Sequence, residues 1–268
     1  MNNKVVLITG ASSGIGFTCA EYFTSRGFKV YGTTRKISQN KQYPCNVTML
    51  ELDICIDESV TKAVESVIKA EGKIDILVNN AGYGIAGAIE DTDVSYAQSQ
   101  MDTNFMGIHR MCKAVLPYMR EASNGRIINI SSVAGFVPIP FQAFYTASKY
   151  AVEAYTRALR LEVDPFGITV CAVEPGDTRT GFTSSREYVL NAEDTVYANV
   201  FKRSISRMEK DEQNGEKPVN VAKVVYKQAT SRRPKICVAV GFQYKLIKLL
   251  LKILPDRIAL FVIGKLYT

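Results

Sequence analysis

The chain has 268 residues, 47% of them hydrophobic and 22% charged, a balance typical of a globular protein with ample core. Its formal net charge is +7, but the basic residues are spread along the chain without a nucleic-acid-binding motif, so no nucleic-acid partner is expected. His109 is the single histidine and is expected to pack within a helical run, so Ser-His-Asp catalysis and histidine-based metal clusters are disfavoured, and no metal is expected.

The six cysteines contain no C-x-x-C pair, and MNNKVVLITG leads directly into a predicted strand without a signal-peptide pattern. Both observations fit a reducing, cytoplasmic setting. The sequence contains no repeats, low-complexity tracts or linkers, so we expect residues 1–268 to form a single domain.

The N-terminal segment predicts a strand, a glycine-rich turn and a helix. Lys4–Ile8 is typical of a buried strand, and the following helix extends to about Arg26, where Gly27 ends it. The turn has the spacing G-x-x-x-G-x-G, which lets the backbone approach a ligand, and the helix N-terminus can bind a pyrophosphate. We therefore expect a nucleotide here, in contact with Gly10, Ser12, Ser13, Gly14, Ile15 and Gly16.

Two basic residues follow the second predicted strand, residues 28–34. An acidic residue at this point would bind the ribose hydroxyls of NAD, but Thr34 occupies the position, and Arg35 and Lys36 come next. The two cations suit the 2′-phosphate of NADP, whereas a solvated pair in a loop is the simpler alternative. The segment therefore favours NADP.

The middle of the chain predicts two more strands and two helices. The third strand, residues 47–54, contains Asp53, a candidate partner for the adenine amino group, and an amphipathic helix follows. After the fourth strand, a turn of small and amide residues can line a cofactor cleft. A long helical region then runs from about residue 95 to 121 and contains Asn104. The cleft residues of the turn are Asn80, Ala81 and Gly82.

The fifth predicted strand, residues 125–132, ends in Ser132, and ligands bind at this end of parallel sheets. On the next helix, Phe144–Val163, Tyr145 and Lys149 lie four residues apart and point from one face. The ammonium would stabilise a phenolate, so the pKa of Tyr145 would fall from about 10 toward neutrality, as proton transfer requires. An isolated Y-x-x-x-K more often marks a surface tyrosine beside a solvated lysine.

The remaining segments complete the sheet and cover its cleft. The sixth predicted strand, residues 167–176, ends in Pro-Gly, and the polar segment 178–217 looks like an insertion over the cleft. A helix over 219–230 and a seventh strand within 234–241 follow. Strands that alternate with helices in this way predict an α/β fold with a parallel sheet.

Together these stretches resemble the short-chain dehydrogenase/reductase family. The resemblance implies a Rossmann-type, doubly wound, seven-stranded parallel sheet with helices on both faces. The sequence TTRK after the second strand resembles the members that prefer NADP. The matching motifs occur in the family's order between about residues 4 and 180: TGASSGIG (9–16), Asp53, NNAG (79–82), Asn104, Ser132, Tyr145, Lys149 and PGDTRT (175–180).

The resemblance also implies a role for each site residue. Tyr145 would be the general acid in carbonyl reduction and the base in alcohol oxidation, while Lys149 would lower its pKa and hydrogen-bond the nicotinamide ribose. Ser132 would bind the substrate oxygen, and the neighbouring Ser131 would point the other way. Asn104 would hold a water that relays protons through Lys149. Further cofactor contacts are implied for Pro175, Gly176, Thr178 and Thr180.

The tail, residues 242–268, is rich in large apolar residues and carries Lys245, Lys248 and Lys252 on roughly one helical face. It is too short and too interrupted to span a bilayer. An apolar face with a basic rim fits peripheral membrane contact, whereas the simpler alternative is that the tail walls the substrate cleft. Similar tails occur in family members that act on steroids, retinoids or lipid ketones, so a small lipophilic substrate is expected.

The leading hypothesis is an NADP(H)-dependent oxidoreductase that interconverts a carbonyl and a secondary alcohol on a hydrophobic substrate. The alternatives are reduction of a 3-oxoacyl thioester on a carrier protein and, less favoured, a non-catalytic NADP-sensing regulator. Family members commonly pair the helices around 104–118 and 144–163, where Val152, Tyr155 and Leu159 place apolar side chains on more than one face. A homodimer or homotetramer is therefore expected.

Overall fold

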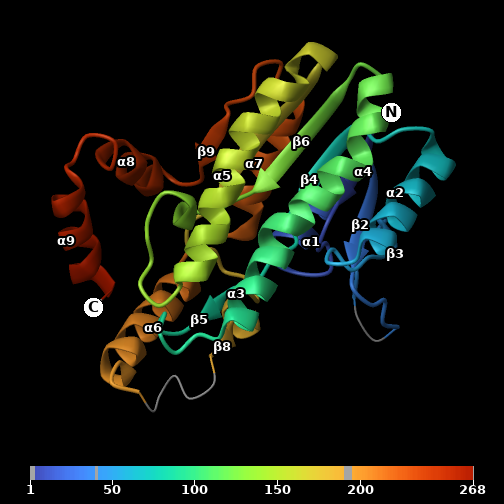
Figure 1. Cartoon of the computed structure of the whole chain (residues 1–268). Helices are drawn as coiled ribbons and strands as arrows, with labels where there is room; N and C mark the ends of the chain where they lie inside the picture. The colour runs from blue at the N-terminus through green and yellow to red at the C-terminus, as the bar shows by residue number, and fades with distance from the viewer. Residues whose placement is uncertain (1–3, 40–41, 190–194, 268) are drawn as a thin grey trace.

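The computed structural model describes residues 4–39, 42–189 and 195–267. Within these residues, seven parallel strands form a sheet in the order β3-β2-β1-β4-β6-β7-β9, which confirms the predicted doubly wound sheet (Figure 1). The strand order reverses between β1 and β4, and ligands of such sheets bind at this point. The strands are β1 (Val5–Ile8), β2 (Lys29–Thr34), β3 (Thr48–Glu51), β4 (Ile76–Asn79), β6 (Gly125–Ile130), β7 (Ile168–Glu174) and β9 (Cys237–Ala239).

Helices cover both faces of this sheet. One face packs against α1 (Gly14–Thr24) and α7 (Pro218–Thr230), which contribute residues such as Phe23 and Val225 to a buried cluster. The other face packs against α2 (Asp57–Glu71), α4 (Gly107–Glu121) and α5 (Ala143–Val163), and α4 and α5 lie in front of the sheet in Figure 1. The central strands β1, β4, β6 and β7 are buried on both sides, which explains their continuous apolar runs.

The long helical region predicted for residues 95–121 is interrupted. It consists of α3 (Val94–Met101), a π-helical turn at Asp102–Met106, and α4. Such π-helical turns often occur at functional sites. Asn104 lies in this turn and is fully buried.

The last two helices, α8 (Phe242–Leu250) and α9 (Asp256–Tyr267), lie on the side of the molecule opposite α2 (Figure 1). α9 contacts α6 (Ala198–Gln213), and α8 contacts β9. A short parallel pair joins β5 (Ile85–Ala86), which precedes α3, to β8 (Glu187–Tyr188), which precedes α6. Residues 190–194 of the predicted insertion and residue 268 of the predicted tail lie outside the described residues.

Two residues predicted to support self-association lie in the core instead. Val152 is fully buried and Leu159 nearly so, both in the cluster between α5 and the sheet. Tyr155 is half-buried, and its ring packs edge-on against Phe105 and His109. The interpretation of Val152 and Leu159 as part of an intersubunit face is therefore wrong, while that of Tyr155 and self-association itself stay predictions.

Candidate active site

The glycine-rich turn after β1 brings the start of α1 close to the strand ends. Gly10 and Gly14 have φ angles of +64° and +57°, in the left-handed region that favours glycine. A Cβ atom on Gly16 would lie 2.3 Å from the Gly10 carbonyl oxygen. Gly16 thus allows close packing against Gly10, and its contact with the cofactor stays a prediction.

Polar side chains hold this turn against the loop after β4. Thr9 Oγ1 accepts hydrogen bonds from the backbone N–H groups of Asn80 and Ala81, at 2.9 and 3.0 Å. Asn80 Nδ2 in return donates to the carbonyl oxygens of Thr9 and Gly10, at 3.0 and 3.1 Å. The loops that follow β1 and β4 therefore form one rigid unit at the point where the strand order reverses.

The predicted phosphate-binding cations stand at the end of β2. Arg35 and Lys36 are exposed, and both line the same cavity as the glycine-rich turn. Glu51 lies opposite Thr34 on β3, but its Oε1 accepts a hydrogen bond from the Ile37 N–H at 2.9 Å. The Glu51 carboxylate is therefore bound to the backbone of the loop that follows Arg35.

The residues predicted to act on the substrate converge from β6 and α5. Tyr145 and Lys149 are buried on one face of α5, and Lys149 Nζ donates to the carbonyl oxygen of Ile130 at 3.0 Å. Ser132 Oγ accepts a hydrogen bond from the Ala134 N–H at 3.1 Å. Tyr145, Lys149 and Ser132 line the cavity that contains the glycine-rich turn.

Burial shifts the pKa values of both members of this pair. Lys149 Nζ lies 5.6 Å from the centre of the Tyr145 ring. Burial raises the pKa of Tyr145 to about 12, although a hydrogen bond with Ser132 lowers it. Burial lowers the pKa of Lys149 to about 8, and the carboxylate of Glu153 opposes that shift. Desolvation therefore shifts the pKa of Tyr145 upward in this structure, in the direction opposite to the predicted fall toward neutrality.

Asn104 is engaged with the backbone beside the site. Its Oδ1 accepts from the Tyr83 N–H at 3.0 Å, and its Nδ2 donates to the Tyr83 carbonyl and to Ser148 Oγ, at 2.9 and 3.2 Å. A Cβ atom on Gly82 would lie 3.0 Å from Asn104 Oδ1 and 3.9 Å from Lys149 Nζ. Asn104 therefore fixes the loop after β4 next to Lys149, and its role in holding a water stays a prediction.

These residues surround a cavity of ≈ 920 Å³. One part of its wall is polar and comes from the loops that follow the strands of the sheet. The other part is apolar and comes from α8, α9 and the turn between them. The predicted site residues on the wall are Gly10, Ser12, Ser13, Gly14, Ile15, Arg35, Lys36, Asp53, Asn80, Ala81, Gly82, Ser132, Tyr145, Lys149, Pro175, Gly176, Thr178 and Thr180.

The tail is fastened to the loop after β7 by two side chains of α8. Tyr244 donates through its hydroxyl to Asp177 Oδ2 at 2.5 Å and accepts from the Asp177 N–H at 3.1 Å. A Cβ atom on Gly176 would lie 2.0 Å from the Tyr244 ring, so this contact requires glycine. Lys248 Nζ donates to Glu174 Oε1. Lys248 therefore points inward, and its predicted place on an exposed basic rim is wrong.

Sequence reasoning missed two neighbouring buried acids, of which Glu174 pairs with this lysine. Glu174 is fully buried at the end of β7, and Glu153 is buried on α5, one turn beyond Lys149. Their carboxylate oxygens and the Cys237 thiol lie within 4.8 Å of one another. Burial and the neighbouring Glu153 raise the pKa of Glu174, while Lys248 opposes this. An acid inside an apolar strand was itself a signal, because a buried charge requires a partner.

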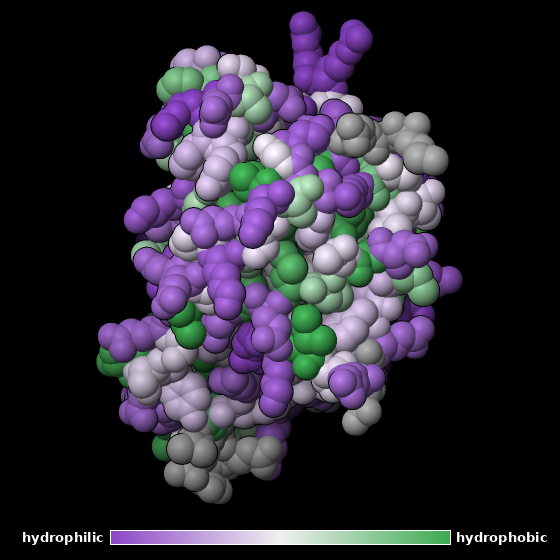
Figure 2. Space-filling view, turned by 90° about the vertical axis from the view of Figure 1, so that its right-hand side faces the viewer, coloured by the Kyte–Doolittle hydropathy of each residue, from purple (hydrophilic) through white to green (hydrophobic). Residues whose placement is uncertain are grey.

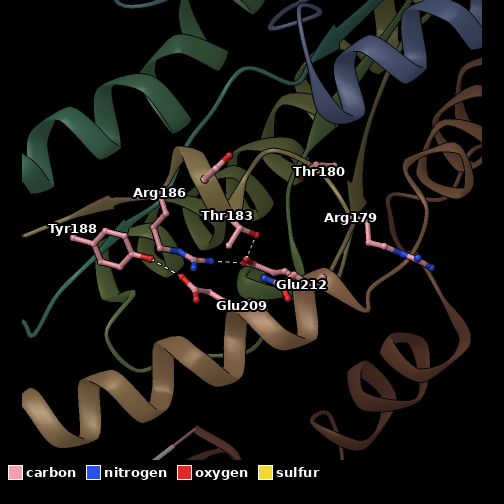
Figure 3. A pocket seen from close by; sticks show the side chains of 9 residues that line it. Arg179, Thr180, Thr183, Arg186, Tyr188, Glu209 and Glu212 are labelled. Carbon is pink, nitrogen blue, oxygen red and sulfur yellow. Dashed lines mark hydrogen bonds and ion pairs between the residues drawn. The ribbon is translucent and has the colours of Figure 1, made fainter.

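A second hollow, of ≈ 720 Å³, lies between residues 179–188 and α6 (Figure 3). The side chain of Arg186 is fully buried and forms an ion pair with Glu212, which also accepts from Thr183 Oγ1 at 2.5 Å. Tyr188 donates to Glu209 at 2.9 Å. These contacts fasten α6 to the chain beside Tyr145, whose ring centre lies 5.6 Å from that of Phe182. This segment therefore lies beside Tyr145, and its role as an insertion that covers the cleft stays a prediction.

The chain was compared with known proteins. Residues 4–189 match the family model of the short chain dehydrogenases. The 3-ketodihydrosphingosine reductase of Bacteroides thetaiotaomicron is 47% identical over 242 residues, which cover 90% of this chain and 89% of the relative.

Solved structures are also similar. A short-chain dehydrogenase from Streptomyces avermitilis has a TM-score of 0.79 and 29% identity, over 92% of this chain and 90% of that one. ElxO with NADP bound has a TM-score of 0.75 and 27% identity, over 91% and 99%. This chain belongs to the short-chain dehydrogenase family of oxidoreductases.

Proposed function

We propose that this protein reduces a ketone on a long-chain lipid to a secondary alcohol, with NADPH as hydride donor. The observation that carries the proposal is the composition of the ≈ 920 Å³ cavity, which combines Ser132, Tyr145 and Lys149 with an apolar wall from α8 and α9. The similar protein from Bacteroides thetaiotaomicron is, by its name, a reductase of 3-ketodihydrosphingosine. A wall of this kind suits an alkyl chain, and the polar side chains suit the carbonyl.

The residues of the cavity fit a nicotinamide dinucleotide. The glycine-rich turn and the start of α1 suit its pyrophosphate, Asp53 suits the adenine, and Arg35 with Lys36 suits the 2′-phosphate of NADP. When bound, NADPH supplies the hydride. ElxO, a similar structure, has NADP bound.

The chain's own residues would handle the proton and the substrate oxygen. Tyr145, whose pKa is raised to about 12, is protonated at neutral pH and is the proton donor to the ketone oxygen. The hydroxyl of Ser132 would donate a second hydrogen bond to that oxygen and stabilise the charge that develops on it. Lys149 would bind the nicotinamide ribose.

A substrate panel followed at the NADPH absorbance band tests this function. It contains ketones of increasing alkyl chain length, a steroid ketone, retinal, a 3-oxoacyl thioester and a small ketone. We expect kcat/KM to rise by up to about fourfold per methylene group until the apolar wall is covered, because a buried methylene contributes about 0.8 kcal/mol. No dependence on chain length would contradict the lipid substrate.

The same panel distinguishes the alternatives. Preferred turnover of the thioester would establish a 3-oxoacyl-thioester reductase, and NADPH binding without turnover of any substrate would indicate a regulator. The variant Tyr145→Phe is the control, because it keeps the ring but has no proton to give. Residual activity in this variant at the wild-type level would show that the assay reports another reaction.

Cofactor choice has its own test. The ratio of kcat/KM with NADPH to that with NADH is measured for the wild type and for Thr34→Asp/Arg35→Ala. We expect a wild-type preference for NADPH of roughly 10- to 150-fold, because hydrogen bonds to charged groups contribute about 1.5–3 kcal/mol. The double variant adds repulsion and removes attraction, so its preference should reverse. A wild-type ratio near one would show that Arg35 does not bind the phosphate.

A further inference from the structure

The outer face of the tail carries large apolar side chains in contact with solvent. Phe242, Ile253 and Phe261 are 82%, 72% and 66% exposed. On α8 and the turn after it, four of the exposed apolar residues recur at intervals of four, three and four, so they form one stripe. The stripe consists of Phe242, Leu246, Leu249 and Ile253. On α9, Leu260 and Phe261 are also exposed.

The same segment is strongly basic. Residues 242–268 contain five basic side chains and one acidic side chain, Asp256. Lys248 is engaged with Glu174, while the other four basic residues are exposed: Lys245 and Lys252 in the segment that carries the stripe, and Arg257 and Lys265 on α9. A face that combines exposed apolar residues with cations complements the interface of an anionic lipid bilayer, where negatively charged headgroups lie over apolar chains.

The cavity of the candidate active site extends to this face. Ile247, Leu250, Val262 and Leu266 line the cavity and are also 38–55% exposed. These side chains of α8 and α9 therefore form both the inner wall and part of the outer surface. A lipid that leaves a bilayer at this point would reach the cavity along apolar side chains.

We propose that the outer face of α8 and α9 docks on the surface of a lipid bilayer that contains anionic lipids, and that the cavity receives its substrate through this face. The docking is interfacial, since no helix in the described part of the chain is long and apolar enough to cross a membrane. The side of the molecule opposite the tail is mainly hydrophilic, with apolar residues in small groups (Figure 2). The second half of the inference rests on the proposed lipid substrate, whereas the docking does not.

Vesicle co-sedimentation of the full chain tests the docking. The vesicles contain phosphatidylcholine alone or phosphatidylcholine with phosphatidylglycerol. We expect binding to the anionic vesicles that weakens with salt, and roughly fivefold weaker binding for each cation removed in Lys245→Gln and Lys252→Gln. In Phe242→Ser/Ile253→Ser/Phe261→Ser, binding should fall at least about tenfold. None of these three residues is on the cavity wall, so turnover of a short, water-soluble ketone should persist.

A matched control uses exposed apolar residues elsewhere on the molecule. Ile89, Val94 and Leu161 are 66%, 70% and 78% exposed, and none of them belongs to the tail. The variant Ile89→Ser/Val94→Ser/Leu161→Ser should bind vesicles like the wild type. Equal loss in both triple variants would overturn the proposal, because binding would then follow general surface hydrophobicity.

Light scattering and KM measurements distinguish membrane docking from self-association and test the access route. If light scattering shows a dimer that the tail triple variant converts to a monomer, and neither protein binds vesicles, a second copy covers the face and the proposal is overturned.

For the access route, KM for a long-chain ketone in vesicles should rise in the tail variant, while KM for the short ketone stays unchanged. Vesicle binding without turnover of any lipid ketone would leave the docking supported and refute the proposed function instead.

Discussion

The ion pair between Lys248 and Glu174 gives a quantitative test of how the tail is held. Lys248→Met keeps the length and packing of the side chain but removes its charge. The Glu174 side chain is 1% exposed and that of Lys248 is 20% exposed. Removing one partner of a buried pair costs about 3–5 kcal/mol, and the partial exposure of Lys248 places the expected loss near 3 kcal/mol. At about 2–4 °C per kcal/mol, the Tm should fall by about 6–12 °C.

The loss should depend on pH in a defined direction. Burial already raises the pKa of Glu174, and removing Lys248 raises it further. In the pH range between the unfolded pKa and this raised value, the folded variant binds more protons than the unfolded chain, so its stability falls as the pH rises. The difference in Tm between wild type and variant should therefore be small at pH 5, where Glu174 is protonated in both, and large at pH 9.

Thermal unfolding followed by circular dichroism at both pH values measures this difference. Lys245→Met is the matched control, because Lys245 is an exposed lysine on the same helix. Adding Glu174→Gln to Lys248→Met should recover most of the loss, because the buried charge is then absent. An equal loss at pH 5 and pH 9, or a loss as large in Lys245→Met, would refute the reasoning.

Three other predictions concern the site. Tyr145→Phe should lower turnover at least about a hundredfold while NADPH binding, followed by fluorescence titration, persists; near-normal turnover would contradict its role as the acid. Glu153→Gln removes the carboxylate that raises the pKa of Lys149, so the fall of kcat/KM with rising pH, expected near pH 8, should move to lower pH; an unchanged profile would mean that Lys149 does not set it. Gly176→Ala should displace Tyr244 and so lower both the Tm, followed by circular dichroism, and the affinity for NADPH; unchanged values of both would contradict the requirement for glycine.

The fold could be predicted because its signals are local. Apolar runs bounded by glycine and polar residues identify the strands, and the helix predicted for 144–163 is found as α5, Ala143–Val163. The glycine spacing and the tyrosine and lysine four residues apart are also local patterns. The topology then places them together without further information, because parallel strands end at one edge of the sheet.

The errors involve contacts that are distant in the sequence. Lys248 lies 74 residues from Glu174, and the tail is apolar on more than one side, so the pattern alone did not show which side faces the protein. For Val152, helical periodicity could not distinguish the core from an intersubunit face. The pKa of Tyr145 depends on how deeply the side chain is buried, and part of that burial comes from the distant segment that carries Phe182. The residues next to Tyr145 in the sequence do not show that this segment covers it.

The order of the elements along the chain bears on synthesis. α8 and α9 follow every strand of the sheet, so the sheet, α5 and the residues around Tyr145 leave the ribosome before the tail does. Until Lys248 arrives, Glu174 is an acid within an apolar strand and the cavity lacks its apolar wall. A nascent chain at this stage exposes apolar surface and is prone to aggregation. The tail therefore completes the folded state, and chains that stop before residue 242 should be targets for chaperones and proteases.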